Sequence, residues 1–483
     1  MTIANGLNVF DFINYANLLQ QSFKTGNYLL PLQAFGSYGG GSGGLSRNFL
    51  FVLLSYPFAY VFSHIAKINI ELVLNIFSTI ATSLSAVFVY KIGRLFFENK
   101  KAIFSTLIYI ATPFIFFVGT NATTYSLLLS TSAIWFYFLF KGIQKKDEKH
   151  GIVSSFAFVA NTFVSLSGAT LIVAHLYGLF KIKKKMTWFV MNLAILAVVF
   201  ASLYYFTFIN KAYPTTFNGL KILFMASLFL WEAVNGLSIV FFVFIIAAFF
   251  MLMVRIFKRK FDYFDAIFTL SFIMLLSSLT VFHFIPLVNF TSVIVLLPIL
   301  FMRTFYGNKY FKFIFVAILI FAFIKITPIV YQFHDFPHPH YAYSLWINQV
   351  AQDGIVLAGH ECPWLQFYTN LTIVCRGRDL TTLDYQNKKL FVTEEYFANE
   401  NQMEFEYVAS SFHLPFTNVV EQELGKPDVI VNKTIAKIAD YPYQVRPIED
   451  PYQWLYSVYP HFYQSAIINL EFLKPRYAIY HVQ

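Results

Sequence analysis

The feature that most constrains this chain is a series of long apolar runs that contain no Asp, Glu, Lys or Arg. A helix crosses the hydrocarbon layer of a membrane with about 20 such residues, because unpaired backbone groups cannot be left in lipid. These runs predict a multi-span α-helical membrane protein, with about 9–11 spans plus interfacial helices when the long runs fold as helical hairpins. The runs cover residues 48–66, 72–90, 102–140, 150–180, 186–210, 233–254, 266–302 and 313–324.

The charged residues divide the chain into two parts. Only 12% of its 483 residues are charged, against about 25% in a soluble domain. Residues 1–330 carry 25 Lys and Arg against 8 Asp and Glu, whereas residues 331–483 carry 10 against 17. The basic residues punctuate apolar runs instead of forming a polar domain, which argues against a nucleic-acid binder. We therefore predict a transmembrane domain over 1–330 and a soluble domain over 331–483.

The basic clusters predict which way the chain faces. By the positive-inside rule they lie on the cytoplasmic side, so an even number of spans separates neighbouring clusters. Runs 102–140 and 266–302 then form hairpins with turns near 119–121 and 283–286, and 150–180 is either two short helices or one tilted helix. The last span, about 313–330, leads outward and makes the tail extracytoplasmic, on the same side as the loops near 120, 211–221 and 283. The clusters are 91–101, 141–149, 181–185, 255–260 and 303–312.

The first third of the chain leaves one question open. Run 72–90 must run inward, so run 48–66 either crosses the membrane or lies in its interface. In the second case residues 1–66 form a first external loop with interfacial helices. Residues 10–19 carry apolar side chains at helical spacing, which is typical of an amphipathic helix on the membrane surface. Asp11 is the only carboxylate of that segment, and it is either a helix-start residue or a functional one.

The tail is predicted to be a small α/β domain. A helix over 343–352 precedes short apolar strand candidates, which Gly, Pro and Asn separate. Its two cysteines, Cys362 and Cys375, are either a disulfide, as an oxidising compartment would allow, or buried thiols. Histidines at 334, 338 and 340 with Asp335 would suit a metal site, although a solvated, proline-stiffened connector is the favoured interpretation. The strand candidates are 355–358, 372–375, 390–393 and 429–431.

The N-terminal segment resembles a known family. "DFINYANLLQQSFKTGNYLLP" is similar to the first external loop of the GT-C superfamily, the polyprenyl-phosphate-dependent glycosyltransferases that include protein O-mannosyltransferases and aminoarabinose transferases. An acidic residue, Tyr-Ala and a Gly-x-aromatic-Leu-x-Pro run recur there, and Asp11, Tyr15-Ala16 and 26–31 follow that order. "IYIATPFIFFVGTNATTYSLLL" and "FHFIPLVNFTSVIVLLPIL" resemble later segments, so the resemblance covers most of residues 8–300.

The resemblance implies the topology and the chemistry of the first loop. It makes run 48–66 interfacial, places Asp11 outside, and implies a first span that is missing here, either through a mis-set start of the sequence or through genuine divergence. A sugar on a polyprenyl phosphate already carries a leaving group, so the enzyme must deprotonate an acceptor hydroxyl and stabilise the departing phosphate. A carboxylate can serve as the general base, while cations and backbone N–H groups hold phosphate. By resemblance Asp11 is that base, and the sugar carbon is inverted.

The remaining site candidates carry a structural alternative each. Arg47 would supply the cation that the family places before the interfacial helix, beside a glycine run that is equally well a linker. Tyr125 stands where many relatives carry a second carboxylate. Glu232 lies in an apolar stretch, where carboxylates are functional by default unless an interfacial helix turns it to water. His283 lies at a predicted turn, where a lone histidine is more often structural. With Tyr15, these residues are the predicted substrate-binding set.

The sequence thus predicts an inverting glycosyltransferase of the cell membrane, with its active site on the outer face. Its partners would be a polyprenyl-phosphate-linked sugar donor and a lipid, glycan or protein acceptor. No metal ligand set is visible, and the cofactor is left open because some relatives use a divalent cation. Two other classes remain: a transporter or flippase for a lipid-linked saccharide, and a non-catalytic relative that acts as an assembly subunit.

Overall fold

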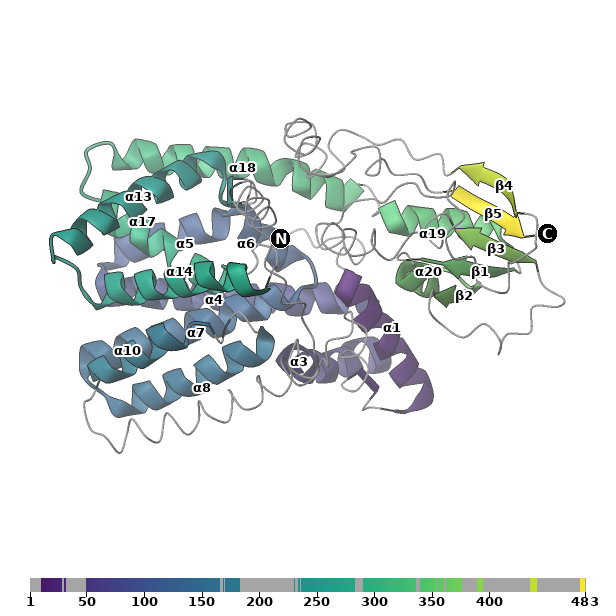
Figure 1. Cartoon of the computed structure of the whole chain (residues 1–483), viewed down its shortest axis with the longest axis horizontal. Helices are drawn as coiled ribbons and strands as arrows, with labels where there is room; N and C mark the ends of the chain where they lie inside the picture. Colours follow the sequence, from purple (N-terminus) through teal and green to yellow (C-terminus); the bar gives the residue numbers. More distant parts are fainter. Residues whose placement is uncertain are drawn as a thin grey trace. The chain divides into compact units, whose positions relative to one another are not determined.

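A computed structural model gives the fold as two compact units, which are described separately. The helical unit contains Met1–Ala4 and Ser22–Val330, and the tail unit joins Asn5–Gln21 to Tyr331–Gln483 (Figure 1). The structure describes residues 10–27, 30–31, 49–165, 168, 170–182, 230, 233–234, 236–282, 290–335, 339–352, 354–359, 362–375, 389–393, 435–440 and 478–482.

The helical unit is built from apolar helices that follow one another along the chain. The first is α3, Phe49–Ala59, which continues as a π-helical turn, η1, over Tyr60–Ile65. The others are α4 (Ile70–Phe96), α5 (Asn99–Ala111), α6 (Pro113–Thr120), α7 (Thr124–Lys145), α8 (Glu148–Val164), α10 (Ile172–Ile182), α13 (Ile239–Phe257), α14 (Tyr263–Phe282), α16 (Thr291–Ile294), α17 (Leu297–Phe305) and α18 (Phe311–Asp335), whose residues from Tyr331 on belong to the tail unit.

Three of the described helices are long and apolar enough to cross a membrane, namely α4, α7 and α13. The bent pair α5 and α6 makes a fourth when it is counted as one span. The multi-span helical class is therefore confirmed, while the total of about 9–11 spans stays a prediction. Run 150–180 forms two short helices, α8 and α10, which is the first of the two predicted alternatives, two short helices or one tilted helix.

The hairpin predicted over 102–140 is confirmed, with a break that hydropathy does not reveal. Its turn lies between the end of α6 at Thr120 and the start of α7 at Thr124. Proline has no N–H and disfavours helical geometry in the residue before it, and Thr112 before Pro113 has φ −66° and ψ 123°. The apolar run is consequently two helices, α5 and α6, bent by 65°.

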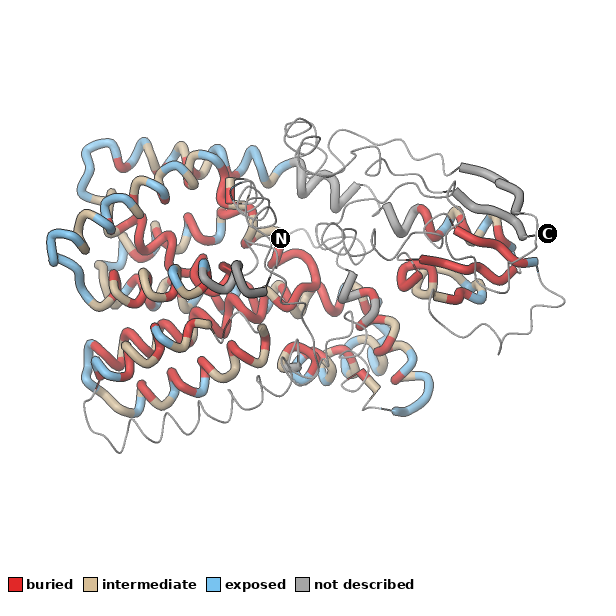
Figure 2. The backbone as a smooth tube through the Cα atoms, in the orientation of Figure 1, coloured by how far each residue is buried: buried red, intermediate tan, exposed pale blue. Residues whose placement is uncertain are grey.

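Helix α7 is the centre of the helical unit, whereas α13 lies at its surface. Figure 2 shows α7 buried along most of its length and α13 with exposed residues throughout. The exposed side chains of α13 are apolar, and Phe250 is 69% exposed. Such a face is stable only in an apolar surrounding, which the lipid of a membrane provides.

Close approach of α10 to α7 depends on a glycine. A Cβ built on Gly178 of α10 would lie 2.6 Å from Cδ1 and 2.8 Å from Cγ of Leu139. Leu139 is fully buried in α7, and close-packed protein interiors leave little free volume into which such a side chain could move.

We expect Gly178→Val to lower the free energy of unfolding by about 1–3 kcal/mol, because overpacking forces the two helices apart. Thermal unfolding of the purified protein in detergent measures the change. Gly307→Val is the matched control, since nothing lies within 4 Å of a Cβ built at Gly307. Equal melting temperatures for the two variants would contradict this account of the α7–α10 contact.

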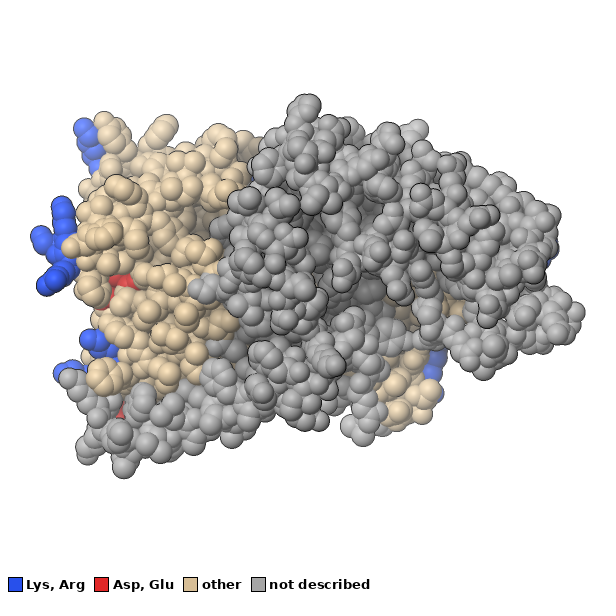
Figure 3. All heavy atoms as spheres, in the orientation of Figure 1, with Lys and Arg blue, Asp and Glu red and all other residues tan. Residues whose placement is uncertain are grey.

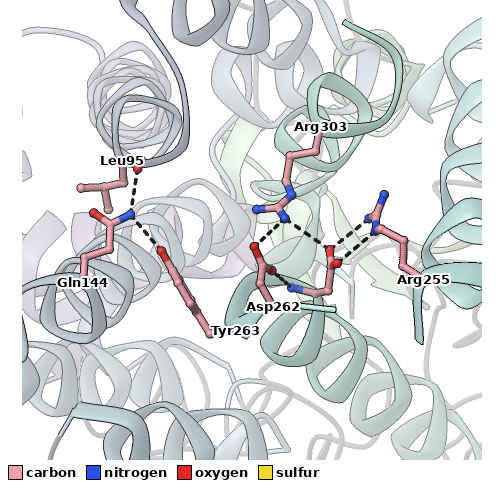
Figure 4. Close-up of polar contacts among 7 residues, drawn as sticks. Leu95, Gln144, Arg255, Asp262, Tyr263 and Arg303 are labelled. Carbon is pink, nitrogen blue, oxygen red and sulfur yellow. Dashed lines mark hydrogen bonds and ion pairs between the residues drawn. The ribbon is translucent and has the colours of Figure 1, made fainter. Parts of the chain in front are cut away.

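Four connections between helices meet at one end of the helical unit (Figure 4). The side-chain amide of Gln144, near the end of α7, donates to the carbonyl of Leu95 at 2.8 Å and to the hydroxyl of Tyr263 at 2.9 Å. Arg303 of α17 donates to Asp262, the residue before α14, at 2.6 Å. These contacts bring together the turns that follow α4, α7, α13 and α17.

The same end of the helical unit carries the basic clusters. The turns joined in Figure 4 belong to clusters 91–101, 141–149, 255–260 and 303–312. On the face shown in Figure 3, most of the Lys and Arg atoms of this unit gather there. The prediction that these four clusters share one side of the helical bundle is therefore confirmed.

The tail unit contains a five-stranded sheet in the order β2-β1-β3-β5-β4. Strand β1 pairs in parallel with β2 and β3, and β5 pairs antiparallel with both β3 and β4. The strands are β1 (Ile355–Ala358), β2 (Thr372–Cys375), β3 (Leu390–Thr393), β4 (Ile435–Asp440) and β5 (Ala478–Val482), and the helices are α19 (Pro339–Val350) and α20 (Cys362–Tyr368).

The predicted small α/β domain is confirmed, and three of its strands have the predicted bounds. Strands β1, β2 and β3 coincide with the candidates 355–358, 372–375 and 390–393. The candidate 429–431 lies outside the described residues. Between β1 and β2 the chain forms α20, and its first residue is covalently joined to the end of β2: Cys362 and Cys375 are a disulfide, with Cα atoms 5.4 Å apart.

Loss of this disulfide is expected to destabilise the tail unit by about 3 kcal/mol, because a cross-link over a loop of this length restricts the unfolded chain. The test compares chemical denaturation of the wild type and of a Cys362→Ser, Cys375→Ser double variant, both in detergent. Wild-type protein reduced before the titration is the control and should match the double variant. An unchanged midpoint in both samples would show that the bond does not stabilise the unit.

Candidate functional site

The helix predicted to carry the catalytic carboxylate is present as α1, Phe10–Thr25. It ends where Gly26 takes φ +70°, a left-handed conformation that glycine adopts without a Cβ penalty and that commonly terminates helices. Asp11 lies in the first turn, and its side chain is outside the described residues. Residues 10–21 of α1 belong to the tail unit and 22–25 to the helical unit.

The face of α1 that carries residue 11 is buried at the positions whose side chains are described. Residues 11, 15, 18 and 22 follow one another at helical spacing and therefore share a face. On that face Tyr15 and Ser22 are 0% exposed and Leu18 is 5% exposed. The sequence segment that carries the family resemblance is thus a packed helix, with position 11 at its N-terminal end.

The last turn of α1 packs on the segment predicted to be interfacial. The Ser22 hydroxyl donates to the carbonyl of Asn27 at 2.9 Å, so the Tyr56 hydroxyl, 3.1 Å away, donates to Ser22. Phe23 lies beside His64, with ring centroids 5.0 Å apart. These contacts link α1 to α3 and η1, and π-helical turns such as η1 are frequent at functional sites.

The turn predicted near residue 120 is held by polar side chains of α4. The side-chain amide oxygen of Asn75 accepts a hydrogen bond from the backbone N–H of Ala122 at 2.7 Å, and the hydroxyl oxygen of Ser78 accepts one from the backbone N–H of Thr123 at 3.1 Å. The Thr79 hydroxyl lies 2.6 Å from the carbonyl of Gly119. The segment between α6 and α7 is therefore fixed by side chains of α4.

These α4 residues were not predicted, although the sequence contains a signal for them. Asn75, Ser78, Thr79, Thr82 and Ser85 recur at intervals of three and four in run 72–90, which places them on one face of a helix. A polar face in a spanning helix turns toward protein, not toward lipid. Four of the five are buried.

Tyr125, in the first turn of α7, packs against the hydrophobic core of the helical unit with its side chain partly buried. The residue that stands in place of the second carboxylate is thus part of a packed helix start. Arg47, Glu232 and His283 lie outside the described residues, as does the loop 211–221.

No group of three or more His, Cys, Asp or Glu side chains that could hold a metal ion occurs within the described part of the chain. The His and Asp cluster at 334–340 is not tested by this finding, because its side chains are outside that part.

A contact within the tail unit joins α1 to the disulfide-bonded helix. The side-chain amide of Asn17 donates to the backbone carbonyl of Pro363 at 2.9 Å. Pro363 is the second residue of α20 and follows Cys362. No sequence pattern relates Asn17 to Pro363, which lie 346 positions apart.

Comparison with known proteins gives one family match. Residues 56–209 match the model of the family described as dolichyl-phosphate-mannose-protein mannosyltransferase. No curated protein matches the chain.

Several solved structures share its fold, among them the following three. The crystal structure of ArnT from Cupriavidus metallidurans in the apo state aligns with a TM-score of 0.56 and 11% identity over 86% of this chain and 92% of that one. The crystal structure of the same protein bound to undecaprenyl phosphate aligns with a TM-score of 0.53 and 11% identity, over 87% of this chain and 92% of that one. The crystal structure of the Archaeoglobus fulgidus oligosaccharyltransferase tethered with an acceptor peptide aligns with a TM-score of 0.50 and 12% identity, over 77% of this chain and 60% of that one.

At these identities the structural likeness is one of fold. The resemblance found in the sequence is confirmed: residues 56–209 match the dolichyl-phosphate-mannose-protein mannosyltransferase family, and the chain has the fold of ArnT.

Proposed function

We propose that this chain is an inverting glycosyltransferase that moves a sugar from a polyprenyl-phosphate donor to a hydroxyl of a lipid, glycan or protein acceptor. The observation that carries the proposal is the match of residues 56–209 to a family whose described donor is a dolichyl-phosphate sugar. The fold supports it, because a protein of this fold binds undecaprenyl phosphate, a polyprenyl phosphate.

In the proposed reaction Asp11 removes the proton from the acceptor hydroxyl. The acceptor oxygen then attacks the anomeric carbon on the face opposite the phosphate, and the bond from that carbon to the phosphate oxygen breaks. Its electron pair leaves with polyprenyl phosphate, so the sugar carbon is inverted. Positioned proton transfer of this kind contributes about 10²–10⁴-fold to a rate.

The departing phosphate needs positive partners. We assign this role to Arg47 and the backbone N–H groups of 39–44, because a guanidinium and a run of backbone amides both bind phosphate oxygens. Tyr15, Tyr125, Glu232 and His283 are proposed to contact donor or acceptor. No step in this scheme requires a metal.

The active site and the tail domain are proposed to face away from the cytoplasm. Four basic clusters at one end of the helical unit support this orientation, because such clusters mark the cytoplasmic side. The Cys362–Cys375 disulfide supports it independently, since structural disulfides persist in oxidising compartments. The domains 1–330 and 331–483, with 1–66 as the first external loop, belong to the same proposal.

The test is transfer by the purified chain in lipid nanodiscs. Polyprenyl phosphates carrying radiolabelled hexoses or pentoses serve as donors, and a lipid and glycan extract of the host membrane serves as acceptor. We expect label in the acceptor together with release of polyprenyl phosphate. Donor movement across vesicles without any transfer would favour a transporter and overturn the proposal.

A non-catalytic assembly subunit is the second candidate. It is favoured by Tyr125, which by the resemblance stands where a second carboxylate is common in the family. This function predicts a membrane-protein partner that copurifies in fixed proportion, and transfer only by the complex. Transfer by the isolated chain would exclude it.

A further inference from the structure

Helix α1 is tied to the tail unit at one defined point. The Nδ2 atom of Asn17 lies 2.9 Å from the carbonyl oxygen of Pro363. A carbonyl oxygen has two lone pairs, so it can accept this bond as well as one within its own helix. The bond therefore adds a partner to α20 without removing one.

The accepting end of this bond is rigidly placed. Cys362 is 1% exposed and is covalently joined to Cys375 of β2, while Leu365 is 0% exposed. Helix α20 packs on α19 and β2. The carbonyl of Pro363 thus belongs to a buried, cross-linked helix start and can serve as a fixed point.

The donating end lies six residues from the proposed base. Six residues advance an α-helix by about 9 Å and turn it by about 240°, so Asn17 lies on a different face from positions 11, 15 and 18. The neighbours of Asn17, Ala16 and Leu18, are buried. A bond at Asn17 therefore fixes the rotation of α1 without occupying the face that carries residue 11.

We propose that the tail domain positions the catalytic helix, and that Asn17 is the positioning residue through its bond to the carbonyl of Pro363. The inference rests on the proposed function and extends it: the tail unit contributes to turnover by holding α1 in the rotation that presents the base. A displacement of about 1 Å in a reacting group costs about 10²-fold in rate, and loss of one anchor displaces the helix for part of the time.

The experiment uses the full chain in nanodiscs and four variants. Asn17→Leu and Asn17→Asp keep the approximate size of the side chain and remove the donor. Asn17→His restores a donor, because Nδ1 of histidine stands at the same number of bonds from Cα as Nδ2 of asparagine. Gln20→Leu is the matched control on the same helix.

Three quantities are measured: the kcat of sugar transfer, its KM for the donor, and the hydrogen exchange of the backbone amides of residues 13–25. We expect Asn17→Leu and Asn17→Asp to lower kcat about tenfold with an unchanged KM for the donor. The α1 amides should exchange about fivefold faster, as expected for one hydrogen bond. Asn17→His should recover most of kcat, and Gln20→Leu should leave kcat, KM and the exchange rates at wild-type values.

An unchanged kcat in Asn17→Leu overturns the positioning role, whatever the exchange rates show. An equal loss of kcat in Gln20→Leu, or no recovery in Asn17→His, also overturns it, because the effect would then be a general loosening of the helix. If the wild type transfers no sugar with any donor, the proposed function fails instead. The exchange rates then decide by themselves whether the tail unit holds α1.

Discussion

An Asp11→Asn variant is expected to lose about 10²–10⁴-fold in kcat for sugar transfer while its KM for the donor stays within about threefold of the wild type. Asparagine has nearly the size of aspartate and can still accept a hydrogen bond, but it cannot take the proton of the acceptor hydroxyl. The loss should therefore appear in the chemical step. Single-turnover transfer by the variant, purified in nanodiscs, measures it.

The matched control for this variant is Asp11→Glu, which keeps a carboxylate and moves it by one methylene. It should retain more activity than Asp11→Asn, because the base is present but displaced. Melting temperatures must agree among the three proteins, so that lost activity is not lost structure. Full transfer by a folded Asp11→Asn protein would remove Asp11 from the mechanism and leave the fold assignment intact.

The second large effect is expected at the end of the helical unit that carries the basic clusters. The side chain of Asp265 is 1% exposed. Its carboxylate accepts two hydrogen bonds from Arg255, one from Nε to Oδ2 and one from Nη2 to Oδ1, both at 3.0 Å. Nη2 of Arg303 lies 3.9 Å from the same carboxylate. Asp265→Ala would remove the carboxylate that pairs with Arg255 through two bonds and would leave Arg303 with Asp262.

We expect Asp265→Ala to lower the free energy of unfolding by about 3 kcal/mol, the lower end of the range for breaking a buried ion pair, because both arginines keep some access to solvent. Thermal and chemical unfolding in detergent measure the change. Transfer by the protein that remains folded should not change, because Asp265 belongs to the end opposite the turn at 121–123.

Asp262→Asn is the control for this prediction. Asp262 is 43% exposed and pairs with Arg303 at 2.6 Å, and exposed pairs contribute about 0–1 kcal/mol. Asparagine also keeps the oxygen that accepts from the backbone N–H of Asp265 at the start of α14. A loss in Asp262→Asn equal to that in Asp265→Ala would mean that burial of the carboxylate does not determine the effect.

The parts of the fold that follow from local pattern were predictable. Strands β1, β2 and β3 are short apolar runs between turn residues, and parallel strands covered on both faces have that pattern. Strand β4 contains Lys437 and ends at Asp440, and β5 contains His481, so neither stands out as an apolar run. The bend at Thr112 was missed for a related reason, since hydropathy does not register the missing N–H of proline.

The candidate site was predictable only where a motif or a periodicity exists. The carboxylate at position 11 is a candidate because the order of residues around it resembles a family. The row on α4 beginning at Asn75 was detectable by its spacing. The bond between Asn17 and Pro363 has no such signal, because it depends on how distant parts of the chain come together.

The order of strands in the tail sheet has a consequence for biosynthesis. Strand β5 follows every other described strand along the chain, yet it lies between β3 and β4, with Leu390 opposite Val482 and Asp440 opposite Ala478. Pairings between such distant residues form slowly. Strand β4 therefore cannot pair with β5 until the ribosome has synthesised β5. A nascent chain halted before residue 478 exposes an unpaired strand edge to chaperones and proteases.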